Sequence, residues 1–134
     1  MKILLDTGVW FRRYHRLPLK PSLVKFLASE AHEFHLSPLS VAEIVFKWRR
    51  GRLPGIPHPA EWVDHSLENF LLVHPSPQAA RRAGSWDWDH GDLVDRLLAA
   101  IAAESDLLLI HTDRVLKKLS GFPQRYFPAA HQSR

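Results

Sequence analysis

Short apolar runs alternate along this chain with longer segments whose apolar residues recur at helical spacing, and this alternation limits the folds open to it. The clearest runs are Lys2–Leu5, Phe34–Leu36 and Leu107–Ile110. Runs of this kind are typical of strands buried on both faces of a parallel sheet. Asp92–Glu104 is the most regular helical segment. The pattern predicts a three-layer α/β/α sandwich around a mainly parallel sheet of four or five strands.

Proline, glycine and serine residues divide the rest of the chain into further elements. We expect further strands at Leu71–His74 and Arg125–Phe127. The expected helices are a segment through Trp10, Phe11 and Tyr14, Pro21–Ala31, a segment from Ser40 to Gly51, Pro59–Phe70, Ser76–Ala83 and Asp113–Leu119. A chain of 134 residues fits one domain, which we place at residues 1–130, with a loose tail at residues 131–134.

Composition excludes several classes of protein. The chain has no Cys, which rules out disulfides, thiolate catalysis and Cys-based zinc sites, and fits a reducing cytosolic compartment. The first apolar run is too short for a signal peptide and no segment is long enough to cross a bilayer, so we expect a cytoplasmic protein without membrane contact. Lys and Arg number 18 against 14 Asp and Glu, a net charge of +4 that favours a polyanionic partner.

Acidic residues stand where predicted strands end or helices begin. They are Asp6, Glu43, Asp95 and Asp113. If the strands are parallel, these positions gather at the edge of the sheet where open α/β folds bind ligands. Carboxylate oxygens gathered there favour a hard cation such as Mg²⁺ or Mn²⁺. A carboxylate-held cation on a basic protein indicates chemistry on phosphates, and a nuclease is the first hypothesis.

Each acid also has an ordinary structural interpretation. The ordinary roles are helix capping by Asp6, Asp92 and Asp113, a capping box formed by Ser40 and Glu43, and a surface ion pair between Glu43 and Lys47. The two interpretations can be separated by whether the carboxylates lie close together in the folded protein. Like charges that meet in a partly buried cleft raise one another's pKa values unless a cation neutralises them. Convergence would therefore favour a metal site.

Read in order, these residues resemble the PIN domain, and within it the VapC-type toxins of type II toxin–antitoxin systems. The matching segments are Leu4–Thr7, Ser37–Ile44 with Lys47 and Gly51–Leu53 behind it, His90–Ala99 and Leu109–Asp113. The resemblance implies that Asp6, Glu43 and Asp95 hold the metal, with Asp113 as a fourth acid. Accessory positions implied by it are Asp92, Thr7 and Thr112.

The same resemblance implies an activity and partners. The activity is divalent-metal-dependent endoribonucleolysis in which water attacks the phosphodiester, leaving a 5′-phosphate and a 3′-hydroxyl. The implied partners are a VapB-like antitoxin, a second copy of the chain in a homodimer, and a structured RNA such as tRNA or rRNA. The chain departs from the family pattern at Gly8, Ala42 and Leu93–Val94, none of them an implied ligand.

Basic residues near the acids are candidates for holding the RNA backbone. They are Arg96, Arg49, Arg50 and Arg52. Arg96 is the best candidate because it follows Asp95 directly. A solvated surface is the alternative for all of them.

Aromatic residues and histidines near the acids have weaker interpretations. Trp86 and Trp88 could stack on unpaired bases, although packing is favoured for them. Trp10, Phe11 and Tyr14 could cover a dimer or antitoxin groove. His90 and His111 lie nearest the acids and could touch substrate, but ordinary polar positions are favoured, since no histidine pair has the H-E-x-x-H spacing.

Other classes of protein fit less well. A haloacid-dehalogenase phosphatase needs a second Asp at position 8, which is Gly, and a receiver domain needs an Asp after the third strand, where Val73–Pro75 has none. A non-catalytic PIN-like module that binds RNA or a protein partner remains the alternative function, and loss of metal-dependent cleavage on substitution of Asp6 or Asp95 would separate the two.

Overall fold

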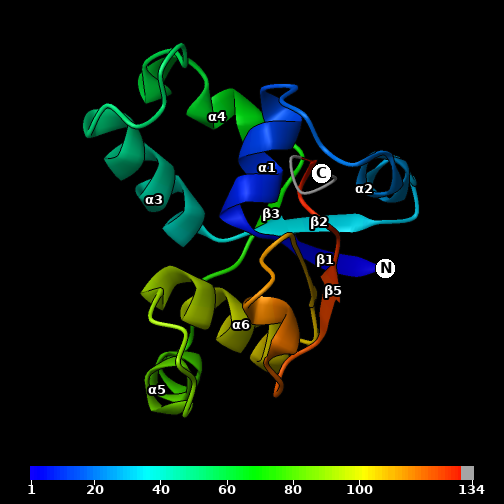
Figure 1. The fold of residues 1–134 in the computed structure, drawn as a ribbon, viewed down its shortest axis with the longest axis vertical. Helices are drawn as coiled ribbons and strands as arrows, with labels where there is room; N and C mark the ends of the chain where they lie inside the picture. Colours follow the sequence, from blue (N-terminus) through cyan, green and yellow to red (C-terminus); the bar gives the residue numbers. More distant parts are fainter. Residues whose placement is uncertain (131–134) are drawn as a thin grey trace.

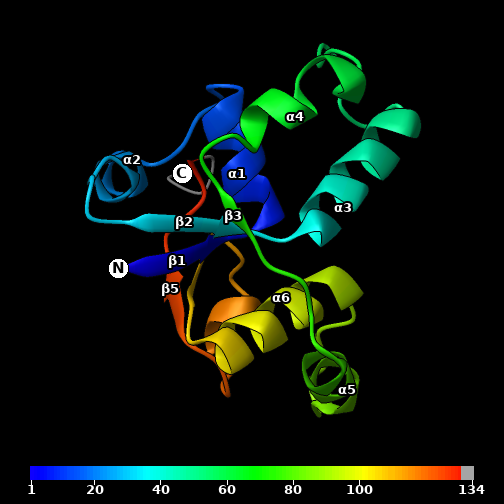
Figure 2. The same cartoon turned by 180° about the vertical axis from the view of Figure 1, so that it is seen from behind.

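The computed structural model describes residues 1–130 as a five-stranded sheet with helices on both faces (Figure 1). The strands lie in the order β3-β2-β1-β4-β5, and every neighbouring pair is parallel. Helices α1 to α4 lie on one side of the sheet, and α5 and α6 lie on the other (Figure 2). The predicted α/β fold with a parallel sheet is confirmed, and the sheet has five strands.

The elements follow one another in regular α/β order. The strands are β1 Lys2–Leu5, β2 Glu33–Leu36, β3 Leu71–Leu72, β4 Leu108–His111 and β5 Gln124–Tyr126. The helices are α1 Thr7–Tyr14, α2 Pro21–Leu27, α3 Pro38–Arg49, α4 Val63–Ser66, α5 Pro77–Ser85 and α6 Leu93–Ser105, with 3₁₀ turns at Pro59–Glu61 and Leu116–Lys118.

The central strand β1 contributes to two hydrophobic cores because its side chains alternate between the faces of the sheet. Ile3 and Leu5 belong to a core on one face, whereas Leu4 belongs to a second core with α6 on the other. All three side chains are fully buried. This double burial explains why β1 reads as a continuous apolar run.

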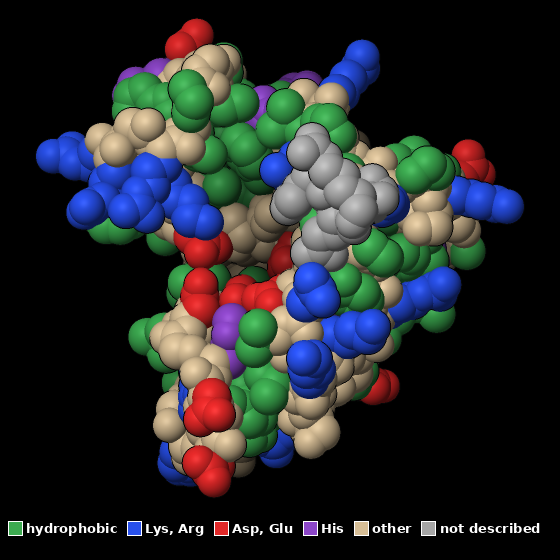
Figure 3. Space-filling model, in the orientation of Figure 1, with side chains coloured by type: hydrophobic (Ala, Val, Ile, Leu, Met, Phe, Trp, Pro, Cys, Tyr) green, Lys and Arg blue, Asp and Glu red, His purple; other side chains and the backbone are tan. Residues whose placement is uncertain are grey.

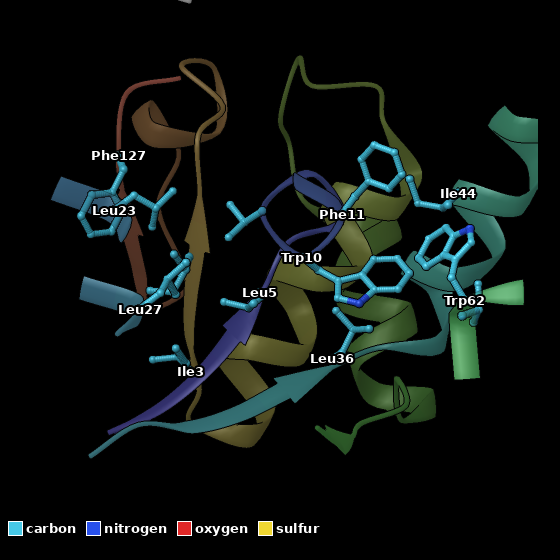
Figure 4. Close-up of a cluster of buried hydrophobic side chains, with 13 residues drawn as sticks. Ile3, Leu5, Trp10, Phe11, Leu23, Leu27, Leu36, Ile44, Trp62 and Phe127 are labelled. Atoms are coloured by element: carbon cyan, nitrogen blue, oxygen red, sulfur yellow. The ribbon is translucent and has the colours of Figure 1, made fainter. Parts of the chain in front are cut away.

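A group of aromatic side chains fills the core beneath α1 (Figure 4). Trp10 and Phe11 are buried and their rings lie 5.7 and 6.0 Å from the ring of Trp62. Tyr14 also stacks on Trp62, with ring centroids 5.6 Å apart. The suggestion that Trp10, Phe11 and Tyr14 cover a partner groove is therefore wrong for the first two, which pack inside the protein.

Several predicted boundaries differ from the structure. Helix α3 begins at Pro38 and not at Ser40, because Ser37 is its N-cap and accepts a hydrogen bond from the Leu39 N–H. The predicted capping box of Ser40 and Glu43 is therefore wrong, since Ser40 lies inside the helix. Proline at the first helical position explains the earlier start.

Three predicted helices are shorter than expected. Pro21–Ala31 ends at Leu27, Pro59–Phe70 contains only a 3₁₀ turn and the four-residue α4, and Asp113–Leu119 contains a 3₁₀ turn. Apolar residues of these segments pack against the core, but the backbone is not one continuous helix. The expected tail at residues 131–134 lies outside the described residues.

Among residues 1–130, no helix has the length and apolar character needed to span a membrane.

The strand order creates a switch point next to β1. From β1 the chain builds β2 and β3 on one side, then returns to place β4 and β5 on the other. Asp6 follows β1 and its backbone N–H donates to the Ile110 carbonyl of β4 at 3.0 Å. The carboxyl ends of β1 and β4 therefore lie side by side, where open α/β sheets bind ligands.

Candidate metal centre at the carboxyl edge of the sheet

Asp6 lies at the switch point between the end of β1 and the start of α1. It caps α1, since its Oδ1 accepts a hydrogen bond from the Val9 N–H at 2.8 Å. Burial raises the pKa of Asp6 to about 7, although the Val9 hydrogen bond opposes the shift. The charges of Asp95, Glu43 and Asp113 raise this pKa further, which places these carboxylates near Asp6.

Asp95 lies in the first turn of α6, on the opposite side of the sheet edge. The Asp92 carboxylate caps this helix and accepts from the Asp95 N–H at 3.1 Å. Burial raises the pKa of Asp95 to about 6, the hydrogen bond from His90 lowers it, and the charges of Asp92 and Asp113 raise it. Asp92 therefore acts as a helix cap that also adds negative charge to the site.

Asp113 and Glu43 complete the group of carboxylates. Oδ1 of Asp113 accepts from the N–H groups of Val115 and Leu116 at 2.8 and 3.2 Å, which holds the chain that leads from β4 into the 3₁₀ turn. Glu43 projects from α3 and lies 3.7 Å from Lys47, at the predicted ion-pair spacing. Its carboxylate is nevertheless close enough to Asp6 to raise the pKa of that residue.

The capping roles and the convergence are both present in the structure. Carboxylates (red) and a histidine (purple) gather in a hollow between the helices of the two faces, and Lys and Arg (blue) border it on the side of α3 (Figure 3). Asp6 and Asp113 each accept backbone N–H groups with Oδ1, which leaves Oδ2 of both residues available to the site. Capping therefore fixes the carboxylates in place and does not compete with ligand binding.

His90 is a member of this group that the sequence analysis placed among ordinary polar residues. Its Nε2 lies 2.8 Å from Oδ2 of Asp95 and 3.6 Å from Oδ2 of Asp113. The side chain is largely buried. No spacing rule reveals it, because the loop of residues 86–92 brings it back over α6. Its position five residues before Asp95 was the only available signal.

The neighbouring hydroxyl and imidazole groups support the site from behind. Thr7 Oγ1 donates to Ser40 Oγ at 2.9 Å, which joins the starts of α1 and α3. The buried His111 accepts from the Asp113 N–H at Nδ1, so its Nε2 carries the proton toward Gln124 Oε1 at 2.7 Å. Burial lowers the pKa of His111. Thr112 is half-buried.

Arg96 serves the loop before α6 and does not project toward the hollow. Its guanidinium donates to the carbonyls of Ala83, Trp86, Trp88 and His90. It also lies over the Trp88 ring, 5.5 Å from the centroid. The hypothesis that Arg96 holds the RNA backbone therefore loses its geometric support, because adjacency to Asp95 in sequence turns its side chain away.

Trp86 and Trp88 pack as the sequence analysis favoured. Their rings stack with centroids 4.1 Å apart and planes 12° apart, and Phe122 lies against both. Both indoles pack against the core beneath α6.

The arginines at the end of α3 and just after it, unlike Arg96, lie at the surface. Arg49 is exposed, and Arg50 and Arg52 line a groove of about 410 Å³ together with Glu43 and Lys47. Leu39, Ala42, Phe46 and Val94 form its apolar walls. This groove joins a basic rim to the carboxylate centre.

The donor set fits a hard divalent cation. Carboxylate oxygens are the preferred ligands of Mg²⁺ and Mn²⁺. Without a cation, burial and mutual repulsion raise the pKa values of Asp6 and Asp95 far above 3.8. A bound dication would remove this repulsion. Asp95 and Asp113 offer ligand atoms within 4.8 Å of each other, and Asp6 and Glu43 are the nearby carboxylates that could complete the ligands of such an ion.

Comparison with known proteins places this fold and site in a family. A family model described as the PIN domain matches residues 3–121, so the chain belongs to the PIN domain family. PIN domains are generally metal-dependent nucleases. No curated protein sequence matches the chain.

Solved structures share the fold at low sequence identity. VapBC2 from Rickettsia felis, bound to a DNA fragment from its promoter, has a TM-score of 0.71 at 14% identity, covering 95% of this chain and 99% of that one. FitAcB from Neisseria gonorrhoeae has a TM-score of 0.65 at 18% identity, covering 96% and 98%. A protein from Pyrobaculum aerophilum has a TM-score of 0.56 at 21% identity, covering 92% of each chain.

Proposed function

We propose that this protein is a divalent-metal-dependent endoribonuclease that acts as the toxin of a VapC-type toxin–antitoxin pair. The observation that carries the proposal is the convergence of Asp6, Glu43, Asp95 and Asp113 around one hollow, with the pKa values of Asp6 and Asp95 raised to about 7 and about 6. Four carboxylates placed this way destabilise one another unless a cation neutralises them. Membership of the PIN domain family supports the same chemistry.

The four carboxylates would have two roles in hydrolysis, which are metal binding and acceptance of a proton. Asp6 and Asp95 would hold Mg²⁺ or Mn²⁺ directly, since Asp6 is fixed as the cap of α1 and the Asp95 carboxylate is held by a hydrogen bond with His90. A bound ion would lower the pKa of the attacking water and neutralise charge on the phosphate oxygens. Glu43 or Asp113 accepts the proton of that water. His111 and Gln124 hold the Asp113 turn in position.

The substrate side of the proposal rests on charge. Arg50, Arg52 and Lys47 line the groove that ends at Glu43, and the exposed Arg49 lies beside them. A phosphate backbone following this rim would bring a phosphodiester to the carboxylates. We propose a structured RNA such as tRNA or rRNA as substrate, with Arg49, Arg50 and Arg52 as backbone contacts.

Partners are proposed by analogy with the structural neighbours. VapBC2 and FitAcB are the proteins named in two of the matched structures. By analogy with them we propose a VapB-like antitoxin for this chain, a homodimer as its assembly, and the cytoplasm as its location. The groove of apolar walls and basic rim beside Glu43 offers a surface on which an antitoxin would also block substrate. Co-expression with the neighbouring reading frame should give a stable complex with suppressed activity.

Cleavage assays on single-carboxylate variants test the enzyme. Protein freed of any antitoxin is incubated with several structured RNAs, with Mg²⁺, with Mn²⁺ and with chelator. Wild-type protein should cleave only with metal, and Asp6→Asn and Asp95→Asn should each lower the rate at least about 100-fold, since each removes a charged ligand. Asp64→Asn, a substitution of an exposed carboxylate on α4, is the control that should leave the rate unchanged.

The alternative function predicts a different result in the same assay. A non-catalytic module would bind RNA or a protein partner without metal-dependent cleavage. Cleavage that survives both Asp6→Asn and Asp95→Asn would mean a contaminating nuclease and would sink the proposal. RNA binding without cleavage under any metal would favour the binding module.

A further inference from the structure

A nitrogen donor faces the carboxylates at the distances that metal ligands keep. One ligand atom each from His90, Asp95 and Asp113 can be chosen so that all lie within 4.8 Å of one another. His90 Nε2 lies 2.8 Å from Asp95 and 3.6 Å from Asp113. Neighbouring ligands around an octahedral ion with bonds of about 2.1 Å are about 3 Å apart. The imidazole is therefore already at the spacing of a ligand beside these carboxylates.

The loop that carries His90 is hydrogen-bonded to the Arg96 side chain of α6. Arg96 donates to the His90 carbonyl at 3.1 Å and to the Trp88 carbonyl at 3.3 Å, and its Nε donates to the Ala83 carbonyl at 2.7 Å. The stacked rings of Trp86 and Trp88 support the same loop. Because Arg96 is next to Asp95 in α6, one side chain fixes the backbone of His90 relative to Asp95.

The ring nitrogen of His90 that faces the carboxylates is the one that could bind an ion. With no ion, the His90 Nε2 carries a proton and donates to Asp95, as the 2.8 Å separation indicates. An ion would be bound by the Nε2 lone pair of the imidazole tautomer that carries its proton on Nδ1. Mn²⁺ prefers oxygen ligands, but as a transition metal it accepts an imidazole nitrogen beside carboxylates more readily than Mg²⁺, which is bound almost wholly by oxygen.

We infer that His90 is a nitrogen ligand of the divalent ion and makes this site selective for Mn²⁺ over Mg²⁺. The inference rests on the proposed function, since it requires an ion at the carboxylate centre. It adds to the oxygen ligands a residue that comes from the loop before α6. The hydrogen bonds from Arg96 to this loop keep the residue within reach of the ion.

Metal binding and pulsed electron paramagnetic resonance test the inference without measuring activity. Mn²⁺ and Mg²⁺ affinities are measured by calorimetry in nitrogen-free buffer for wild type, His90→Ala and His90→Gln, and Mn²⁺ spectra are searched for ¹⁴N coupling. His90→Ala should abolish the coupling and weaken Mn²⁺ binding about tenfold or more, while Mg²⁺ binding changes much less. The exposed His74→Ala is the matched control and should keep both the coupling and the affinity.

His90→Gln separates a ligand from a hydrogen-bond partner, because glutamine keeps a polar side chain of similar reach but has no imidazole nitrogen. Wild-type Mn²⁺ affinity in this variant, or no ¹⁴N coupling in the wild-type protein, would overturn the inference. Asp95→Asn tells which proposal has failed. If it loses Mn²⁺ binding while His90→Ala does not, the metal centre stands and the histidine ligand falls. If Asp95→Asn binds Mn²⁺ as wild type does, both fall.

Discussion

Individual carboxylates at the edge of the sheet serve as helix caps and as members of one charged cluster. Asp6 and Asp113 each use Oδ1 to accept backbone N–H groups. The cap holds the carboxylate in a single orientation, and burial next to like charges then raises the pKa of Asp6 to about 7. The charged form of Asp6 is therefore destabilised in the metal-free fold. A bound cation would stabilise it.

The raised pKa values predict how metal-free stability depends on pH. In the folded protein the pKa values of Asp6 and Asp95 rise from 3.8 to about 7 and about 6. A carboxyl group with a raised pKa contributes its stabilisation fully below the unfolded value, near 4, and loses it as the pH rises through the folded value. Metal-free Asp6→Asn should therefore melt at least about 3 °C above wild type at pH 8, and by a smaller margin at pH 5.

Thermal melts in chelator at both pH values measure this difference, with Asp64→Asn as the exposed control. Saturating Mn²⁺ at pH 8 should reverse the order of the melting temperatures, because only the wild-type carboxylate binds the ion fully. An identical difference between Asp6→Asn and wild type at pH 5 and pH 8 would contradict the buried, repelled state assigned to Asp6.

Helix α6 and the loop before it form a unit in which one arginine organises the backbone. Residues 86–92 have no regular secondary structure, and Arg96 donates to the carbonyls of Trp86, Trp88 and His90 in this segment. The helix supplies Asp95 to the candidate site and the loop supplies His90. The placement of both residues therefore depends on a side chain that does not touch the site.

Substitution of Arg96 should loosen this loop and destabilise the fold. Arg96→Gln removes most of the donors to the four carbonyls, and we expect a loss of about 2–4 kcal/mol because partly buried acceptors lose their partners. Denaturant unfolding measures the loss, and hydrogen exchange should accelerate in residues 84–92. Arg82→Gln breaks an ion pair with Glu104 at the surface and should cost less than about 1 kcal/mol. Equal losses in the two variants would refute the role given to Arg96.

The whole molecule brings distant segments together through its strand order. The neighbouring positions of β1 and β4 place Asp6 beside the turn that carries Asp113. Helices α3 and α6, which lie on opposite faces of the sheet (Figure 1), then bring Glu43 and Asp95 near Asp6. The aromatic core beneath α1 supports this arrangement from within, since Trp62 packs on Trp10, Phe11 and Tyr14.

Truncation of Trp62 should destabilise the molecule without altering the chemistry of the site. The side chain is 5% exposed, and Trp62→Ala should cost about 3–5 kcal/mol as a buried aromatic. Phe46→Ala, at a side chain 59% exposed, is the control and should cost less than about 1 kcal/mol. Denaturant unfolding measures both. A loss in Trp62→Ala as small as in Phe46→Ala would show that the aromatic core does not hold α1 in place.

Local sequence patterns identified the strands, the long helices and the acids next to them. Strands buried on both faces are continuous apolar runs, and helices have apolar residues at helical spacing, so both can be recognised from neighbouring residues. Side-chain direction and the meeting of segments leave no such record. Arg96 therefore turned toward carbonyls of the preceding loop, and His90 came to lie between Asp95 and Asp113. Contacts of this kind depend on loop path and packing, which arise only when the whole chain has folded.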